Sequence, residues 1–406
     1  MKIGFFTDSY LPQLNGVATS VDVWARTLEK LGHTVYIIAP RYPGYKDARK
    51  RVIRLTSLKL WRQPEIRLAV YPTPKTILKI SKLNLDIIHG LSGGSISTLG
   101  LIVARLKKIP FVFTYYTRWN HYTHYILEGK LVSPKMAERV SRVFCNKCDC
   151  ITVPMQKIKD ELVSFGVKKP ITVIQSGVDL DKFAKQNIES LSKITGIKKR
   201  KILLYVGRLS KEKSVDFLLK AFQLIKIKNP RSHLVLVGDG PDKGKLKKLS
   251  QRLHIEKNVH FTGLVNHEEI NKVYKHASVF VFASQTETQG IVILEALASG
   301  LPIVAVADEV FDGVLKDKIN SVLVERNEEQ FAKACLAILN NNLYREKLSK
   351  NAYKTACEFS VSKTAREFER LYQMLIYSKN KNLFYGGGRW IDKWISAIER
   401  YEKYES

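Results

Sequence analysis

Short apolar runs of strand length alternate with amphipathic segments of helix length along most of the chain. This alternation is typical of parallel α/β layers, in which a helix follows each strand and covers one face of the sheet. The clearest helical segments are Ser20–Leu31, Ser97–Leu106, Asp216–Ile227 and Ile291–Ser299. The expected strands are Lys2–Phe6, Thr34–Ala39, Asp86–His89, Phe111–Tyr115, Ile151–Val153, Ile171–Ile174, Lys201–Val206, His233–Val237, Val259–Thr262, Val279–Ala283, Leu301–Val306 and Ser321–Val324. The pattern predicts two doubly wound α/β domains.

The length of 406 residues also fits two domains, since one domain commonly has about 100–200 residues. A polar segment with little periodicity, 183–200, ends in a basic run and is the expected hinge. We therefore expect an N-terminal domain, a C-terminal domain, a terminal helix and an appended aromatic and charged tail, which cover 1–185, 186–358, 359–377 and 378–406.

The charge of the chain is strongly unbalanced, with 67 Lys and Arg against 38 Asp and Glu, a formal net charge of +29. Such a charge attracts polyanions, which include anionic lipid headgroups, nucleic acid and phosphorylated substrates. A basic nucleic-acid-binding protein is the non-enzyme alternative, although the sequence contains no recognisable nucleic-acid-binding motif. With 45% apolar and 26% charged residues, the chain has the composition of a folded enzyme rather than of a disordered protein.

The first residues have the pattern of a buried strand rather than of a secretory signal, so a cytoplasmic location is expected. No stretch approaches the about 20 apolar residues that a membrane-spanning helix needs, so any membrane contact is expected to be peripheral. The five cysteines are expected as reduced thiols. Cys145, Cys148 and Cys150 are clustered, but a structural zinc site needs a fourth ligand. We expect these three to serve packing, with metal or redox chemistry as the alternative.

The segment 283–300 combines a strand end, a polar loop and a short helix, which is where α/β domains bind ligands. Glu287 lies in the loop and Glu295 about two turns farther along the helix, so both carboxylates can face one cavity. The alternative is that Glu287 only caps the helix, although an acid within so apolar a helix favours function at Glu295. Backbone N–H groups at the helix start suit a phosphate or sugar hydroxyls; the residues there are Thr288, Gln289, Gly290 and Ile291.

A second junction between strand and loop carries Arg208 and Lys213, directly after the expected strand Lys201–Val206. The guanidinium offers a planar fork of donors and the ammonium a point charge, so together they can pair with a diphosphate. The alternative is solvated surface charge, which the position after a buried strand makes less attractive.

Two loops that contain glycines give weaker evidence of ligand binding. Gly238 and Gly240 follow the expected strand His233–Val237, but the third glycine and the ribose-binding acid of a dinucleotide site are not in place. An oxidoreductase is therefore disfavoured. Gly16 ends a long first loop and allows a ligand to approach backbone amides closely.

These motifs, in this order, resemble those of retaining glycosyltransferases of family 4 (GT4) over residues 1–377. The Glu-x7-Glu motif of that family matches Glu287 and Glu295, and its Arg-x4-Lys pair matches Arg208 and Lys213. The resemblance implies a GT-B fold, in which two doubly wound Rossmann-like domains face each other across a cleft. It also implies a nucleotide-sugar donor and no metal ion, since the two cations act in place of a metal.

The same resemblance implies a role for each matching residue. Arg208 and Lys213 contact the diphosphate, and His124 is a further candidate catalytic residue. Glu295 binds the ribose, and Glu287 lies at the transferred sugar. The implied donor-binding residues, with Gly263 and Leu264 in the loop beside the nucleobase, are Gly16, Arg208, Lys213, Gly263, Leu264, Glu287, Thr288, Gln289, Gly290, Ile291 and Glu295.

Three segments look like the diacylglycerol glucosyltransferase subgroup of the family. Glu287-Thr288-Gln289-Gly290 stands where most members have Glu-x-Phe-Gly, and the segments 122–125 and 308–312 also match the subgroup. The resemblance implies transfer of glucose from UDP-glucose to a membrane lipid such as 1,2-diacylglycerol. A phosphatidylinositol mannosyltransferase and a transferase with a soluble sugar acceptor are the alternatives within this class.

One position departs from the family pattern. Tyr116, which precedes Thr117, stands where the family has a His against the transferred sugar. His121 or His124 can compensate, and the alternative for His124 is ordinary structural hydrogen bonding. The departure also gives slight weight to a catalytically silent chain that serves as a scaffold.

The segment 41–82 contains 12 Lys and Arg against two acidic residues, and apolar residues are interleaved with them. Basic and apolar residues together suit an anionic bilayer, where each cation contributes about 1 kcal/mol near the headgroups. We expect this segment to hold the chain on the inner face of the cell membrane, with a solvated basic face as the alternative. Trp390 and Trp394 suggest either interfacial anchoring of the tail or docking on the protein's own surface.

Overall fold

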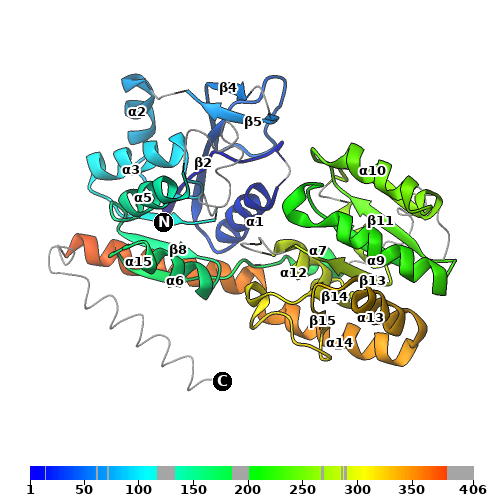
Figure 1. The fold of residues 1–406 in the computed structure, drawn as a ribbon. Helices are drawn as coiled ribbons and strands as arrows, with labels where there is room; N and C mark the ends of the chain where they lie inside the picture. The colour runs from blue at the N-terminus through cyan, green and yellow to red at the C-terminus, as the bar shows by residue number, and fades with distance from the viewer. Residues whose placement is uncertain are drawn as a thin grey trace, which may run out of the picture. The chain divides into compact units, whose positions relative to one another are not determined.

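The computed structural model divides the chain into two compact units (Figure 1). The first contains Met1–Ser176 and the chain from Val361 onward, and the second contains Gly177–Ser360. The described residues are 1–13, 15–60, 63–70, 73–116, 133–184, 201–266, 269–284, 287 and 290–381. Most of the expected hinge, and the tail with Trp390 and Trp394, lie outside the described residues.

The first unit is built on a parallel sheet with the strand order β3-β2-β1-β6-β7-β8-β9. The strands are β1 (Lys2–Phe6), β2 (Thr34–Pro40), β3 (Val52–Leu55), β6 (Ile87–Gly90), β7 (Phe111–Thr114), β8 (Cys150–Val153) and β9 (Ile171–Val173). An antiparallel hairpin, β4 (Ser57–Leu60) and β5 (Gln63–Ala69), lies outside this sheet. The order reverses at β1 and β6, which is the doubly wound pattern that places ligands at the carboxyl ends of the strands.

Two separate cores lie on the two faces of this sheet. Neighbouring residues of a strand point to opposite faces, so Phe6 belongs to one core and Phe5 to the other. The first core is covered by α2 (Pro74–Ser81), α3 (Ser95–Lys107), α5 (Pro134–Cys145) and α6 (Gln156–Ser164). The second is covered by α1 (Gly16–Lys30) and α15 (Val361–Asn380).

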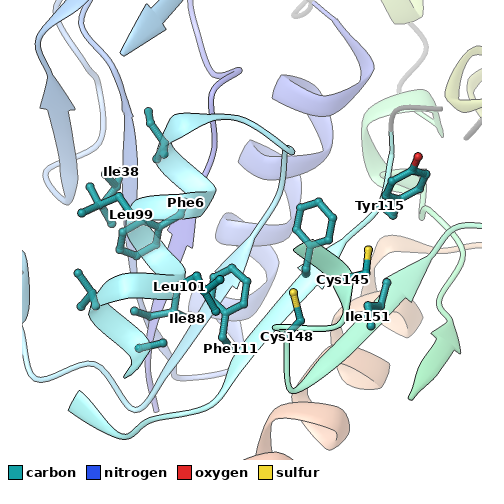
Figure 2. Close-up of a cluster of buried hydrophobic side chains, with 14 of the residues drawn as sticks. Phe6, Ile38, Ile88, Leu99, Leu101, Phe111, Tyr115, Cys145, Cys148 and Ile151 are labelled. Atoms are coloured by element: carbon teal, nitrogen blue, oxygen red, sulfur yellow. The ribbon is translucent and has the colours of Figure 1, made fainter. Parts of the chain in front are cut away.

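The cysteine cluster belongs to the first unit's interior. Cys145 and Cys148 lie among Phe111, Ile151 and other apolar side chains (Figure 2). Burial raises the pKa of the Cys145 thiol to about 12, which disfavours the thiolate that redox chemistry and metal binding require. These side chains pack as small hydrophobic groups.

Helix α15 returns from the second unit and completes the first. Its Phe368 packs on Trp24 of α1 with a ring-centroid distance of 4.7 Å. Its Tyr372 hydroxyl lies 2.6 Å from Nδ1 of His89, a fully buried residue of β6. The other ring nitrogen, Nε2, lies 2.5 Å from the Thr114 hydroxyl. Both polar ends of this histidine are therefore satisfied inside the core.

The second unit has a parallel sheet with the strand order β12-β11-β10-β13-β14-β15. The strands are β10 (Ile202–Val206), β11 (His233–Val237), β12 (Val259–Gly263), β13 (Val279–Phe282), β14 (Ile303–Val306) and β15 (Ser321–Val324). Its helices are α7 (Leu180–Ala184), α9 (Val215–Lys228), α10 (Lys243–Arg252), α11 (Ile270–His276), α12 (Ile291–Ala298), α13 (Glu328–Asn340) and α14 (Asn342–Glu358). Short 3-10 helices are η3 (Lys211–Lys213), η4 (Glu256–Asn258) and η5 (Glu309–Phe311).

The predicted fold class is confirmed, because both units are parallel α/β layers and every expected strand is present. The segment 41–82 holds strands that the sequence did not indicate, β3 and the β4–β5 hairpin. Its dense Lys and Arg residues obscure the alternation by which a half-buried strand is recognised. The terminal helix was expected to be a separate part, whereas α15 packs into the first unit.

Replacing Tyr372 with Phe should lower the free energy of unfolding by about 1–3 kcal/mol, because a buried histidine nitrogen then has no partner. The matched control is Tyr377→Phe, on the same helix but 62% exposed, which should change stability little. Urea unfolding of both variants measures the difference. Equal stabilities would contradict this role for the Tyr372–His89 contact.

The stability of the first unit should fall in acid because of His89. Burial lowers the pKa of His89 to about 3, whereas an unfolded histidine has a pKa near 6.5. Below that value only the unfolded chain binds the proton, so His89 should remove about 1.4 kcal/mol of stability per pH unit between about pH 6.5 and 3. Unfolding curves of the wild type and His89→Gln should therefore converge as the pH falls. Parallel pH dependences would refute this.

Candidate functional site

The predicted donor residues of the second unit follow three strands of its sheet. β10 pairs in parallel with both β11 and β13, so the carboxyl ends of these strands lie at one edge. The loops that begin after Val206, Val237 and Phe282 therefore start from the same edge, although they are far apart in the sequence.

Close backbone contacts hold two of these loops together. The amide N–H of Leu209 donates to the carbonyl oxygen of Asp239 at 3.0 Å. A Cβ atom on Gly238 would lie 2.0 Å from the Gly207 carbonyl oxygen, and one on Gly240 would lie 2.3 Å from the Leu209 oxygen. The two glycines therefore allow one loop to pack on the other, where any side chain would clash with a backbone oxygen.

Lys213 and Glu287 meet in this loop cluster. The Lys213 Nζ atom lies 2.5 Å from Glu287 Oε1, and the two side chains are only 16% and 15% exposed. Lys213 ends the 3-10 helix η3, and Glu287 comes from the loop after β13. The structure thus brings together one residue from each predicted motif, a cation for a diphosphate and a carboxylate for a sugar.

Tyr205 supports the loop that carries Arg208. Its hydroxyl donates to the backbone carbonyl oxygen of Arg208 at 2.9 Å. Burial, followed by the charges of Glu287 and Glu212, raises its pKa well above the usual value, so the phenol keeps its proton. Glu212 is itself held by the Ser210 hydroxyl, which donates to Oε1 at 2.7 Å. The Arg208 side chain is exposed at this loop.

Glu295 is a buried carboxylate on helix α12. It is 7% exposed, and Oε2 accepts a hydrogen bond of 2.8 Å from the Tyr274 hydroxyl. Burial raises the pKa of Glu295, and the charge of Lys182 and the Tyr274 hydrogen bond act against that rise. Burying a carboxylate in such an apolar helix costs free energy unless polar partners surround it. Here Lys182 of α7 and Tyr274 of α11 are those partners.

The start of helix α12 lies beside these groups in the sequence. Gly290 caps the helix with a φ of 57°, a left-handed conformation that glycine adopts readily, and Ile291 is the first helical residue. Thr288 and Gln289, which were predicted to bind the donor, lie outside the described residues.

The remaining predicted residues occupy three other places. Gly263 ends β12 with a φ of 74°, and Leu264 beside it is 65% exposed. Gly16 begins α1 in the first unit, where the Asn15 side chain caps the helix. His124 lies outside the described residues, as do His121 and the segment 122–125.

Tyr116, at the position of the family histidine, is 4% exposed. Its ring lies 6.0 Å from that of Trp24 in the second core of the first unit. This position therefore carries a core side chain in this protein.

Three polar residues were not anticipated from the sequence. Tyr274 on α11 positions Glu295 and Tyr205 of β10 positions the Arg208 loop, but a tyrosine is no signal of a site by itself. Asp8 follows β1 and accepts hydrogen bonds from the Ser92 hydroxyl and the Ile96 amide at the start of α3. Burial raises the pKa of Asp8. Its place directly after the first strand was the available signal.

Two further observations concern the described part of the chain. It contains no group of three His, Cys, Asp or Glu side chains that could hold a metal ion. It also contains no helix with both the length and the apolar character needed to cross a membrane.

Family models match both halves of the chain. The model for glycosyltransferase family 4 matches residues 14–182, and the model for glycosyl transferases group 1 matches residues 187–355. Two relatives are named alpha-monoglucosyldiacylglycerol synthase. The one from Acholeplasma laidlawii is 34% identical over 410 residues, with 94% of this chain and 99% of that protein covered. The one from Streptococcus pneumoniae is 34% identical over 382 residues, with 91% and 85% covered.

A solved structure shares the fold along nearly the whole chain. The crystal structure of Anabaena HepE in complex with UDP-glucose superposes with a TM-score of 0.72 at 19% identity, covering 92% of this chain and all of that one. Because family models match both halves and the identity to two synthases spans most of the chain, the protein belongs to glycosyltransferase family 4 and is a glycosyltransferase with the GT-B fold.

Proposed function

We propose that this glycosyltransferase transfers glucose from UDP-glucose to 1,2-diacylglycerol with retention of the anomeric configuration. The main support for the proposed donor site is the contact between Lys213 and Glu287, which brings together one residue from each of the two sequence motifs. The lipid acceptor is supported by the two synthases, whose names describe an α-linked monoglucosyl diacylglycerol. UDP-glucose carries its glucose in an α linkage, so an α-linked product corresponds to retention.

In this proposal the cations of the loop cluster bind the donor diphosphate. Arg208 and Lys213 face the phosphate oxygens, and Glu287 holds the Lys213 ammonium in place beside the transferred glucose. Glu295 accepts a hydrogen bond from a ribose hydroxyl through Oε1, because Tyr274 occupies Oε2. The donor-binding set further includes Gly16, Gly263, Leu264, Thr288, Gln289, Gly290 and Ile291, with His124 as a candidate catalytic residue.

The reaction proceeds on one face of the sugar. The acceptor hydroxyl oxygen forms a bond to the anomeric carbon while the bond from that carbon to the β-phosphate oxygen breaks. The hydroxyl proton passes to the departing diphosphate, so charge and atoms balance. Negative charge grows on the diphosphate in this step, and fixed cations there lower the barrier most.

The lipid acceptor places the enzyme at a membrane, and we propose a peripheral position on the cytoplasmic face. The segment 41–82 supplies exposed cations, but three of its arginines are engaged within the protein. Arg49 pairs with Glu29 at 2.6 Å and Arg54 with Asp47 at 2.6 Å. Arg67 donates to the Ser57 hydroxyl. The segment is therefore less cationic toward a membrane than its composition suggests.

The reaction is tested with radiolabelled UDP-glucose, UDP-galactose and GDP-mannose and vesicles that contain diacylglycerol. The proposal expects labelled α-glucosyl diacylglycerol from UDP-glucose, and no labelled lipid from the Glu287→Ala variant. Labelled mannolipid would favour a mannosyltransferase instead. A bound donor without any lipid labelling would point to a soluble acceptor.

Lys213→Ala should lower kcat by about 10²–10³, the usual cost of losing one group that stabilises transition-state charge. Lys211→Ala is the matched control, because Lys211 lies in the same 3-10 helix but is exposed. Arg208→Ala should behave like Lys213→Ala. The effects of Lys213→Ala and Glu287→Ala should not add in the double variant, since paired residues act as a unit. Full turnover in Lys213→Ala would argue against this site.

Tyr274→Phe should raise the KM for UDP-glucose several-fold and change kcat less, since Glu295 binds the ribose rather than the reacting atoms. The hydroxyl lowers the pKa of Glu295, so its loss should move the acid limb of kcat/KM to higher pH. The control is Tyr353→Phe, which is 42% exposed on α14. An unchanged pH profile would show that Tyr274 serves packing alone.

A further inference from the structure

The segment 207–214, called the cation loop, crosses the carboxyl edge of the second unit's sheet. Near its start, the amide N–H of Leu209 donates to the carbonyl oxygen of Asp239 in the loop after β11. Farther along, the Ser284 hydroxyl, which lies just after β13, donates to the carbonyl oxygen of Glu212 at 3.4 Å. Because β11 and β13 flank β10, these contacts hold the start and the middle of the cation loop from both sides of its own strand.

The end of the cation loop is held from a more distant strand. The Ser214 hydroxyl accepts a hydrogen bond of 3.0 Å from Nη2 of Arg326. Arg326 follows β15, which β13 and β14 separate from β10. Neighbouring strands lie about 4.8 Å apart, so this side chain reaches a loop that starts from a strand about 14 Å away. The guanidinium carbon also lies 5.2 Å from the ring centroid of Phe217 on α9, a cation–π contact that helps to fix the arginine.

The backbone at Ser214 is strained. Its φ is 50° and its ψ is 41°, a left-handed conformation that is uncommon for a residue other than glycine. This conformation turns the chain from η3 into α9, and the Ser214 side chain makes no capping bond to that helix. Such a conformation persists only where the surrounding contacts hold it. The hydrogen bond from Arg326 is one of these contacts, and it acts on a residue that is only 8% exposed.

Ser214 directly follows Lys213, so its conformation affects where the Lys213 ammonium lies. The Ser214 amide N–H donates to the Lys211 carbonyl oxygen at 3.1 Å, which closes the turn of η3. The ammonium at the end of this turn lies 2.5 Å from Glu287. A charge-assisted bond of this length tolerates little displacement, and a misplacement of about 1 Å can lower a rate by about 100-fold. A change at Ser214 is therefore transmitted to the cation of the donor site.

We propose that Arg326 is a positioning residue that acts on the donor through Lys213. By holding Ser214, it keeps the end of the cation loop where the Lys213 ammonium meets both Glu287 and the donor diphosphate. The inference rests on the proposed function, which assigns Lys213 to the diphosphate. A direct contact with the diphosphate and support of the fold alone are the two competing roles for Arg326. They differ from positioning because neither depends on Lys213.

Equilibrium binding of UDP and of GDP tests this role without a sugar or an acceptor, since both nucleotides carry the diphosphate. For the nucleotide that the wild type binds more tightly, Arg326→Gln should weaken binding about 10-fold, because a displaced cation loses much of its contribution. In a Lys213→Ala background the same change should alter binding by less than about twofold, since residues that act as a unit are not additive. Arg231→Gln, at an exposed turn before β11, is the matched control and should bind like the wild type.

A second variant makes the test independent of how well Arg326→Gln folds. Ser214→Gly removes the hydroxyl that Arg326 binds, and a φ of 50° suits glycine. Urea unfolding should therefore show a stability close to that of the wild type, while nucleotide binding falls about as far as in Arg326→Gln. Combining the two changes should weaken binding no further, because both break the same hydrogen bond.

The outcomes separate this proposal from the proposed reaction. Wild-type affinity in both Arg326→Gln and Ser214→Gly would overturn the positioning role. An equal loss of affinity with and without Lys213 would also overturn it, and would indicate a direct contact or support of the fold. A wild type that labels no lipid, while its variants follow the expected pattern of nucleotide binding, would refute transfer to diacylglycerol and leave the role of Arg326 standing. Labelled glucosyl diacylglycerol together with an equal loss would refute the role of Arg326 alone.

Discussion

The parallel pairing of β10 with β13 is the constraint on which the candidate site depends. Leu203 pairs with Val279 and Leu204 with Phe280, so both strands deliver their loops to the same edge. Lys213 and Glu287 are 74 residues apart in the sequence and meet at 2.5 Å only because of this alignment. The ion pair is largely buried, and removing one partner would leave the other charge without compensation. The sheet therefore fixes the positions of the two side chains relative to each other.

The strands and the motif residues were predictable because each carries its signal locally. A buried parallel strand is a short apolar run. Arg208 and Lys213 lie in the loop after such a run, and Glu295 lies within an apolar helix. The supports of these residues were not predictable. Tyr274 reaches Glu295 from another helix, and the two loop glycines, Gly238 among them, accommodate a carbonyl oxygen from a neighbouring loop. Such contacts depend on tertiary packing, which a single sequence does not display.

The first unit shows a different limit of sequence reading. Its second core is closed by α15, more than two hundred residues after the strands it covers, through contacts such as Trp24 with Phe368. The periodicity of apolar residues predicts this helix but does not indicate which core it packs on. The buried His89 also gives no signal in the sequence, although its Nδ1 contact with Tyr372 joins the sheet to α15 and its Nε2 contact with Thr114 lies within the sheet. A chain that leaves a domain and returns can be recognised only when the packing is seen.

Net charge alone does not say where a polyanion binds. In the segment 41–82 the density of basic residues is high, yet Arg49 and Arg54 are neutralised by carboxylates within the protein. On α3 and α5 the density is lower, yet the cations are exposed and alternate with exposed aliphatic side chains such as Val140. Attraction to an anionic surface depends on charges that are free of internal partners, and retention there depends on apolar area. Exposure alone does not make a charge free of internal partners, since the exposed Arg105 of α3 lies 3.8 Å from Asp149 Oδ1.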